Sequence, residues 1–137
     1  MLERLVLRCL IVDDNQRFLV AARELLEREG INVVGFASTT DEAIERAAQL
    51  RPDVTLVDID LGADSGFDTA RRLAETAGGP ASSVILTSTY AEEDFADLIE
   101  ASPAIGFVSK SELSAQAILA LLESEPDADA STPPGTQ

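Results

Sequence analysis

Residues 54–60 read VTLVDID, an apolar run that ends abruptly in acids. Its first four residues are aliphatic or β-branched, which favours a strand, and they show no alternation between apolar and polar positions. A strand of this kind is expected to be buried on both faces, as in a parallel sheet. Asp58 would then lie at the carboxyl end of that strand, with limited solvation.

Similar apolar runs recur on either side of this segment, and amphipathic segments separate them. The runs cover residues 5–12, 31–37, 54–57, 84–86 and 105–108. This alternation predicts an α/β fold of (βα)5 type, and right-handed crossovers then give a doubly wound, five-stranded parallel sheet with helices on both faces.

The helical segments carry start and stop signals. We expect a first helix that ends at Gly30 and whose apolar face carries Phe18, Ala22, Leu25 and Leu26. A second helix would begin with a capping box at Thr39 and Glu42 and end before Pro52. A third would cover 67–77 and end at 78–79, a fourth would cover 92–101, and a fifth would begin after Ser111 as N-cap.

Composition limits the possible functions. The net charge is −15, so binding to nucleic acid or to an anionic membrane is not expected. The chain has one cysteine and no signal-peptide pattern, which favours the cytoplasm. Histidine is absent, so a hard metal ion would be bound by carboxylates. We expect one domain over residues 1–123 and a disordered, acidic and Pro-rich tail over 124–137.

Polar side chains follow four of the five predicted strands. Asp13 and Asp14 follow the first, Asp58 the third, Thr87 ends the fourth and Lys110 follows the fifth. Each alone has an ordinary structural role open to it: a helix cap, an Asx turn, a strand threonine or a solvated lysine. Because ligands bind outside the carboxyl ends of parallel strands, the set together predicts a site.

The chemistry of these residues suggests a role for each. The carboxylates of Asp13, Asp14 and Asp58 suit Mg²⁺, which prefers oxygen ligands. Asp58 could act as a nucleophile and form an acyl phosphate. Lys110 would place a positive charge on the phosphoryl oxygens, and Thr87 would supply a short donor that responds to their arrival.

The ordered motifs resemble the receiver domain of two-component response regulators, over roughly residues 7–122. They are IVDD at 11–14, VDIDL at 57–61 with Gly66 downstream, VILT at 84–87 and GFVSK at 106–110. The resemblance implies a flavodoxin-like strand order 2-1-3-4-5, the order for which a chemotaxis receiver is a standard example.

The resemblance also implies roles at the site. Asp58 would be the phosphoacceptor, with Lys110 and Thr87 as its catalytic partners. Asp14 would bind Mg²⁺ directly, Asp13 mainly through water, and the backbone carbonyl of Asp60 would be a further ligand.

The same resemblance implies a switch and partners. Thr87 and Phe107 would be coupled, so that phosphorylation reshapes the face formed by the fourth helix, fifth strand and fifth helix. The phosphodonor would be a sensor histidine kinase or phosphotransfer protein, and the output a contact with a downstream protein target. Phosphorylation could also promote a homodimer. We expect a single-domain regulator, not an enzyme that acts on a separate substrate.

Some residues depart from the family pattern. Ser111 follows the lysine where many receivers have proline, and Gly62 replaces a common proline in the loop after Asp58. Asp60 and Thr89 occupy positions that tune the lifetime of the phosphorylated state in this family.

Two alternatives are open at this point. The pair Asp58 and Asp60 resembles the acids of haloacid-dehalogenase-type phosphatases, although there the pair follows the first strand rather than the third. A receiver fold kept purely as an interaction module, without phosphorylation, is the second. A nucleotide site is disfavoured, because the chain has no G-x-G-x-x-G motif after the first strand and no P-loop.

Overall fold

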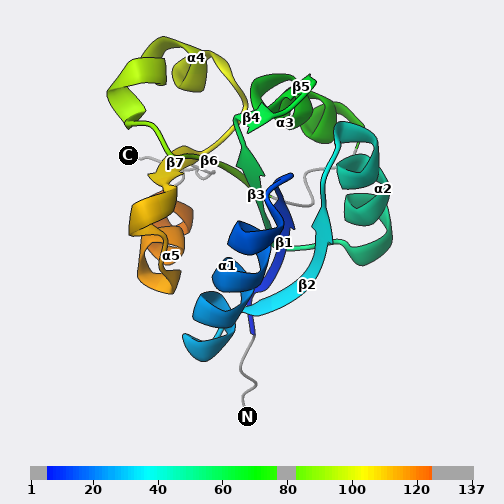
Figure 1. Cartoon of the computed structure of the whole chain (residues 1–137), viewed down its shortest axis with the longest axis vertical. Coiled ribbons are helices and arrows are strands. Elements are labelled where there is room, and N and C mark those ends of the chain that lie inside the picture. Colours follow the sequence, from blue (N-terminus) through cyan, green and yellow to red (C-terminus); the bar gives the residue numbers. More distant parts are fainter. Residues whose placement is uncertain (1–5, 77–82, 125–137) are drawn as a thin grey trace, which may run out of the picture.

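A computed structural model describes residues 6–76 and 83–124 and shows one parallel sheet at the centre of the molecule (Figure 1). Its strands are β1 (Arg8–Val12), β2 (Asn32–Ala37), β3 (Val54–Asp58), β6 (Ser83–Ser88) and β7 (Gly106–Ser109). They are arranged in the order β2-β1-β3-β6-β7, and β4 (Asp60–Leu61) and β5 (Asp64–Ser65) form a separate hairpin. The predicted doubly wound fold with order 2-1-3-4-5 is therefore confirmed.

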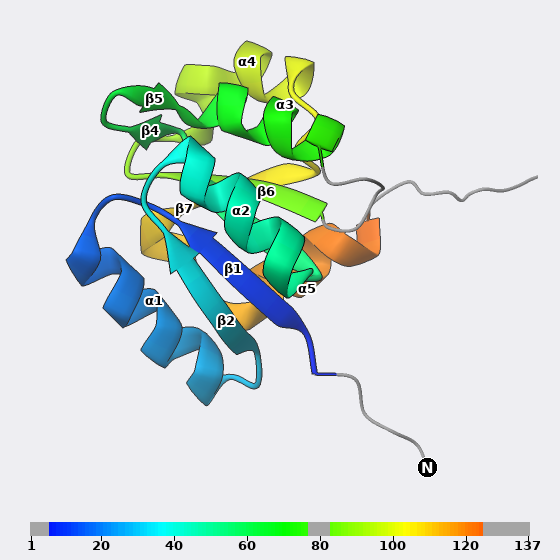
Figure 2. The same cartoon turned by 90° about the vertical axis from the view of Figure 1, so that its right-hand side faces the viewer.

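Helices cover both faces of the sheet. One face carries α1 (Gln16–Arg28) and α5 (Ala115–Ser124), and the other carries α2 (Thr40–Leu50), α3 (Gly66–Thr76) and α4 (Ala96–Ala101), as Figure 2 shows. No helix within the described ranges is long and apolar enough to cross a membrane.

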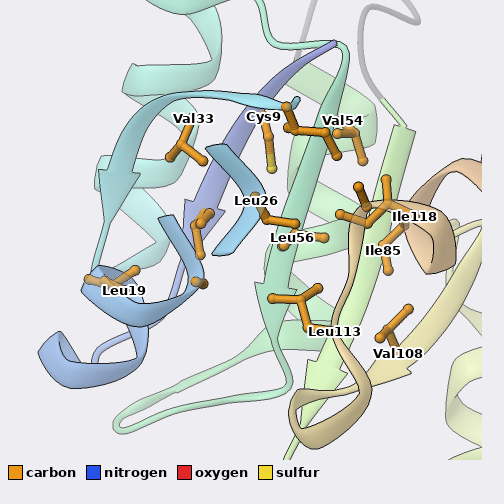
Figure 3. Packing of buried hydrophobic residues seen from close by; sticks show 14 residues of the cluster. Cys9, Leu19, Leu26, Val33, Val54, Leu56, Ile85, Val108, Leu113 and Ile118 are labelled. Carbon is orange, nitrogen blue, oxygen red and sulfur yellow. The ribbon is translucent and has the colours of Figure 1, made fainter. Parts of the chain in front are cut away.

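Successive residues of β1 supply the core on opposite faces of the sheet. Cys9 and Ile11 belong to the cluster beneath α1 and α5, which Figure 3 shows, whereas Leu10 and Val12 belong to the cluster beneath the other helices. All four are fully buried. Burial on both faces explains why the strands lack a period of two in their hydropathy.

The N-termini of the first two helices are fixed by side-chain caps. Asn15 Oδ1 accepts hydrogen bonds from the backbone N–H groups of Arg17 and Phe18. Thr39 Oγ1 accepts from Glu42 N at 3.2 Å, as the capping box predicts, but the Glu42 carboxylate reaches back to the N–H of Ser38. The cap of α1 is thus Asn15 and neither of the two aspartates that precede it.

Three details correct the sequence-based predictions. Ser111 is not the N-cap of the last helix: it lies in a 3₁₀ turn over Lys110–Glu112, and α5 begins at Ala115. Ser114 Oγ instead accepts the N–H of Ala117. The predicted fourth helix divides into a 3₁₀ turn η1 (Glu92–Phe95) and α4.

The third correction is the hairpin of β4 (Asp60–Leu61) and β5 (Asp64–Ser65), which the sequence did not predict. A two-residue strand is too short to give a hydropathy pattern. Gly62 in its turn has a φ of +73°, a conformation that favours glycine. The predicted end of the third helix at 78–79 lies outside the described residues. So does the predicted tail over 124–137, except for Ser124, which is the last residue of α5.

Candidate functional site

The carboxyl ends of β1, β3, β6 and β7 bring the predicted site residues to one edge of the sheet. Asp13 directly follows β1, Asp58 is the last residue of β3, and Lys110 directly follows β7. Thr87 is paired in register with Asp58 on the neighbouring strand β6. The parallel topology thus places side chains from distant parts of the sequence next to one another.

Three carboxylates form the centre of the site. One carboxylate oxygen from each of Asp13, Asp14 and Asp58 lies within 4.8 Å of the other two. Asp13 and Asp58 are buried, with 0% and 6% of their surface exposed, whereas Asp14 is exposed. Three negative charges this close repel each other unless a cation or hydrogen-bond donors compensate them.

Backbone amides satisfy part of this negative charge. Asp13 Oδ1 accepts the N–H of Asn15 at 2.9 Å, and Asp58 Oδ1 accepts the N–H of Asp60 at 3.1 Å. Each hydrogen bond closes a turn of the chain at the end of a strand and therefore fixes the orientation of its carboxylate relative to the sheet. The other oxygen of each carboxylate faces Lys110.

Lys110 is the cation that pairs with this cluster. Its Nζ lies 2.7 Å from Asp13 Oδ2 and 3.2 Å from Asp58 Oδ2, and only 11% of its side chain is exposed. Asp13 Oδ2 is buried and has no hydrogen bond of good geometry within the described part of the chain, although it has this ion-pair contact. One ammonium thus pairs with two of the three carboxylates.

Burial and the neighbouring charges shift the pKa values of Asp58 and Lys110. Burial raises the pKa of Asp58 from 3.8 to about 6, and the negative charge of Asp13 adds to the rise, while the Asp60 N–H and Lys110 oppose it. Burial alone would lower the pKa of Lys110, but the carboxylates of Asp13 and Asp58 outweigh it and raise that pKa. Asp58 is therefore a carboxylate whose negative charge is poorly stabilised.

The donor set fits a divalent, oxygen-preferring cation such as Mg²⁺. The cluster has several carboxylate oxygens within reach of one another, an excess of negative charge, and a buried oxygen, Asp13 Oδ2, with unused acceptor capacity. Asp14 is exposed and gives solvent access, which suits an ion that keeps several waters. A role for the Asp60 carbonyl as a further ligand stays a prediction.

The predicted switch residues lie on adjacent strands beside the site. Thr87 is 1% exposed and Phe107 is 8% exposed. Phe107 pairs in register with Leu86, the residue before Thr87, and belongs to the core cluster beneath α2, α3 and α4. The aromatic ring is thus buried in this structure, and the coupling between the two residues stays a prediction.

Gly66 has a structural role that sequence reasoning did not assign. Its N–H donates to Ile59 O, and a Cβ atom at this position would lie 2.1 Å from the backbone oxygen of Asp58. No side chain fits there, so glycine is required by close approach to the segment that carries Asp58. The sequence showed Gly66 as a motif residue downstream of Asp58 and directly before an amphipathic helix, but neither signal indicates a close approach of two backbone segments.

Comparison with known proteins identifies the family. Residues 9–123 match the model of the response regulator receiver domain. The protein-glutamate methylesterase/protein-glutamine glutaminase of Thermotoga maritima is 32% identical over 108 residues, which make up 77% of this chain and 30% of that protein. The chain thus spans about a third of the length of the first curated relatives it matches.

Solved structures agree with this match. A two-component response regulator of the LuxR family from Aurantimonas has a TM-score of 0.77 at 27% identity, over 90% of this chain and 92% of that one. A response regulator from Burkholderia pseudomallei has a TM-score of 0.72 at 28% identity, over 85% of this chain and 66% of that one. The chain belongs to the response regulator receiver domain family, and its place is in two-component signalling.

Proposed function

We propose that this chain accepts a phosphoryl group on Asp58 from a sensor histidine kinase or phosphotransfer protein and passes the signal to a downstream protein. The observation that carries the proposal is the geometry around Asp58. Its carboxylate lies within 4.8 Å of two further acids, and the ammonium of Lys110 is 3.2 Å from Asp58 Oδ2. This arrangement suits a nucleophile that receives an anionic group next to a cation.

The proposed step forms a bond between a carboxylate oxygen of Asp58 and phosphorus. It breaks the bond between phosphorus and the donor nitrogen, which leaves with the electron pair and regains a proton as the partner's histidine. That histidine belongs to the partner, because this chain contains none. Lys110 would contact the phosphoryl oxygens from its position beside Asp58. A Mg²⁺ ion bound by Asp13, Asp14 and Asp58, with the Asp60 carbonyl, would supply further positive charge.

Related proteins support this chemistry. The Burkholderia pseudomallei structure was solved with a phosphorylated aspartic acid and a calcium ion. The haloacid-dehalogenase alternative has no support, since Asp58 follows the third strand of the main sheet and the whole domain matches the receiver family. The chain would therefore be a phosphoacceptor, with hydrolysis of its own acyl phosphate as its only turnover.

The output would be a protein contact at the face formed by η1, β7 and α5. A groove of about 520 Å³ lies there, and Phe107 forms part of its wall together with Glu92, Glu112 and Leu121. Movement of Thr87 toward a phosphoryl group would let Phe107 repack and change this groove. We further propose that phosphorylation promotes a homodimer through this or another face. The proposed location of the protein is the cytoplasm.

Phosphotransfer from a panel of labelled histidine kinases tests the proposal. We expect label to move to the wild type and to Asp68→Asn, which changes an exposed acid that pairs with Arg71 on the surface of α3, but not to Asp58→Asn. Equal labelling of Asp58→Asn would place the phosphoacceptor elsewhere. No labelling of the wild type by any kinase would favour an interaction module that works without phosphorylation.

A further inference from the structure

The Lys110 ammonium has an aromatic ring as a third neighbour. Its Nζ lies 4.5 Å from the centroid of the Phe18 ring, in addition to its contacts with Asp13 and Asp58. A cation within about 6 Å of a ring centroid is attracted by the negative face of the ring. The attraction is stronger here than at the surface, because water reaches only 11% of the lysine side chain.

The start of α1 fixes the position of this ring. The Phe18 N–H donates to Asn15 Oδ1 at 3.2 Å, and the Asn15 N–H donates to Asp13 Oδ1 at 2.9 Å. One turn of the chain therefore orients both an acid of the site and the residue that covers Lys110. Phe18 is half-buried and packs against the core cluster beneath α1 and α5, which restricts its movement.

We propose that Phe18 is a positioning residue that holds Lys110 beside Asp58 for phosphoryl transfer. A divalent cation and Lys110 compete for the same carboxylates and repel each other. The ring attracts the ammonium but is no ligand for a hard cation, which binds oxygen. Phe18 would thus keep the ammonium in place while the acids bind the metal. This inference rests on the proposed phosphorylation of Asp58.

Substitution of the ring measures its contribution. With Mg²⁺ and a small acyl phosphate as donor, Phe18→Leu should lower the rate constant of phosphorylation by roughly threefold to tenfold. Phe18→Tyr keeps an aromatic face and should restore most of the rate. Phe36→Leu is the matched control, since Phe36 packs against the same core cluster and should keep the wild-type rate.

Fluorinated phenylalanines at position 18 separate the electrostatic role from packing. One, two and three fluorine atoms progressively withdraw electron density from the ring and hardly change its shape. The phosphorylation rate should fall stepwise along the series. A rate that stays constant along the series would show that the ring only fills space and would overturn the proposal.

A measurement without metal or phosphodonor tests the contact itself. The ring current of Phe18 should shift the ε-methylene proton resonances of Lys110 upfield, and Phe18→Leu should abolish that shift while Phe36→Leu retains it. Absence of the shift in the wild type would overturn the inference. If the shift is present but the wild type cannot be phosphorylated, the proposed function fails for reasons unrelated to Phe18, and the positioning role falls with it.

Discussion

The two ends of the central sheet differ in how well their charged side chains are compensated by neighbouring groups. At the amino end, Arg8 Nη1 donates to the carbonyl oxygens of Leu50 and Arg51 at 2.6 and 2.9 Å, and the Arg8 N–H donates to the Asp53 carboxylate at 2.8 Å. These contacts close the C-terminus of α2, where a cation is favourable. At the carboxyl end, three carboxylates lie close together, and the ammonium of Lys110 pairs with two of them, Asp13 and Asp58.

This difference separates residues that stabilise the fold from residues of the candidate site. At the amino end, Arg8 and Asp53 have hydrogen-bond partners in the protein. At the carboxyl end, the two buried carboxylates outnumber the ammonium that pairs with them, which leaves an excess of negative charge. Such an excess opposes folding and is typical of functional sites, where stability is lost for chemistry. Changes at the amino end should therefore destabilise the protein, and removal of an acid at the other end should stabilise it.

The largest expected effect comes from the backbone that supports the acids. Gly66→Ala would place its Cβ 2.1 Å from the backbone oxygen of Asp58, so the segment that carries Asp58 must shift. We expect a loss of about 3 kcal/mol in the free energy of unfolding, at the upper end of overpacking effects. Urea denaturation of the purified variant measures it.

Gly30→Ala is the matched control for this variant. Gly30 has a φ of +98°, but a Cβ atom added there would meet no atom within 4 Å, so only the backbone conformation opposes alanine. The loss should be about 1 kcal/mol. Equal losses in the two variants would show that close approach at Gly66 is not important.

Loss of the guanidinium at the amino end is the next largest effect. Arg8→Met keeps an apolar stem but removes two hydrogen bonds to the end of α2. We expect a loss of about 2 kcal/mol by chemical denaturation, since both bonds involve a charged donor. Arg71→Met removes an exposed ion pair with Asp68 and should lose less than about 1 kcal/mol. An equal loss would contradict a specific role for Arg8.

Removal of a charge at the carboxyl end should have the opposite sign. In the presence of a chelator at neutral pH, Asp58→Asn should raise the free energy of unfolding by about 1–2 kcal/mol, because it relieves repulsion among buried acids. Addition of Mg²⁺ should stabilise the wild type more than the variant, since the variant lacks one of the three carboxylates proposed to bind the metal. Thermal unfolding with and without Mg²⁺ checks both. A lower free energy of unfolding for Asp58→Asn than for the wild type in chelator would contradict an excess of negative charge at this end of the sheet.

The smallest predicted effect is the pH dependence of that difference. The pKa of Asp58 is raised to about 6 in the folded protein from 3.8. A carboxyl with a raised pKa binds its proton more tightly when folded, so it favours folding below pH 3.8 and loses that contribution as pH rises through about 6. The advantage of Asp58→Asn should therefore be largest above about pH 6 and shrink toward about pH 4. An advantage that is constant over this range would contradict the raised pKa.

The sheet and its site edge could be predicted from the sequence because they depend on strong local signals. Runs such as 54–57 are apolar on both faces, and the polar residue that ends each run marks the sheet edge. Asp58 could be predicted in this way, because an acid directly after a buried apolar strand is costly to the fold unless it serves a site.

Contacts between distant segments could not be predicted from the same signals. Ser114 caps the first turn of α5 by accepting the N–H of Ala117. The carboxylate of Glu29, at the C-terminus of α1, accepts the N–H of Ala115 in the same turn, at a distance of 2.7 Å. Ser111 has the same local character as Ser114, so only the tertiary structure distinguishes the two. The contact of Phe18 with Lys110 was hidden for the same reason, since the residues are far apart in the chain and the phenylalanine fits an ordinary core position.

The most direct test is intact-mass spectrometry after incubation with Mg²⁺ and a small acyl phosphate, with the wild type compared with Asp58→Ala. The arrangement of acids and Lys110 predicts a single phosphoryl adduct on the wild type that requires Mg²⁺ and is absent from the variant. An adduct that persists in Asp58→Ala, or a wild type that acquires none with this donor or with a panel of histidine kinases, would contradict the central role of Asp58.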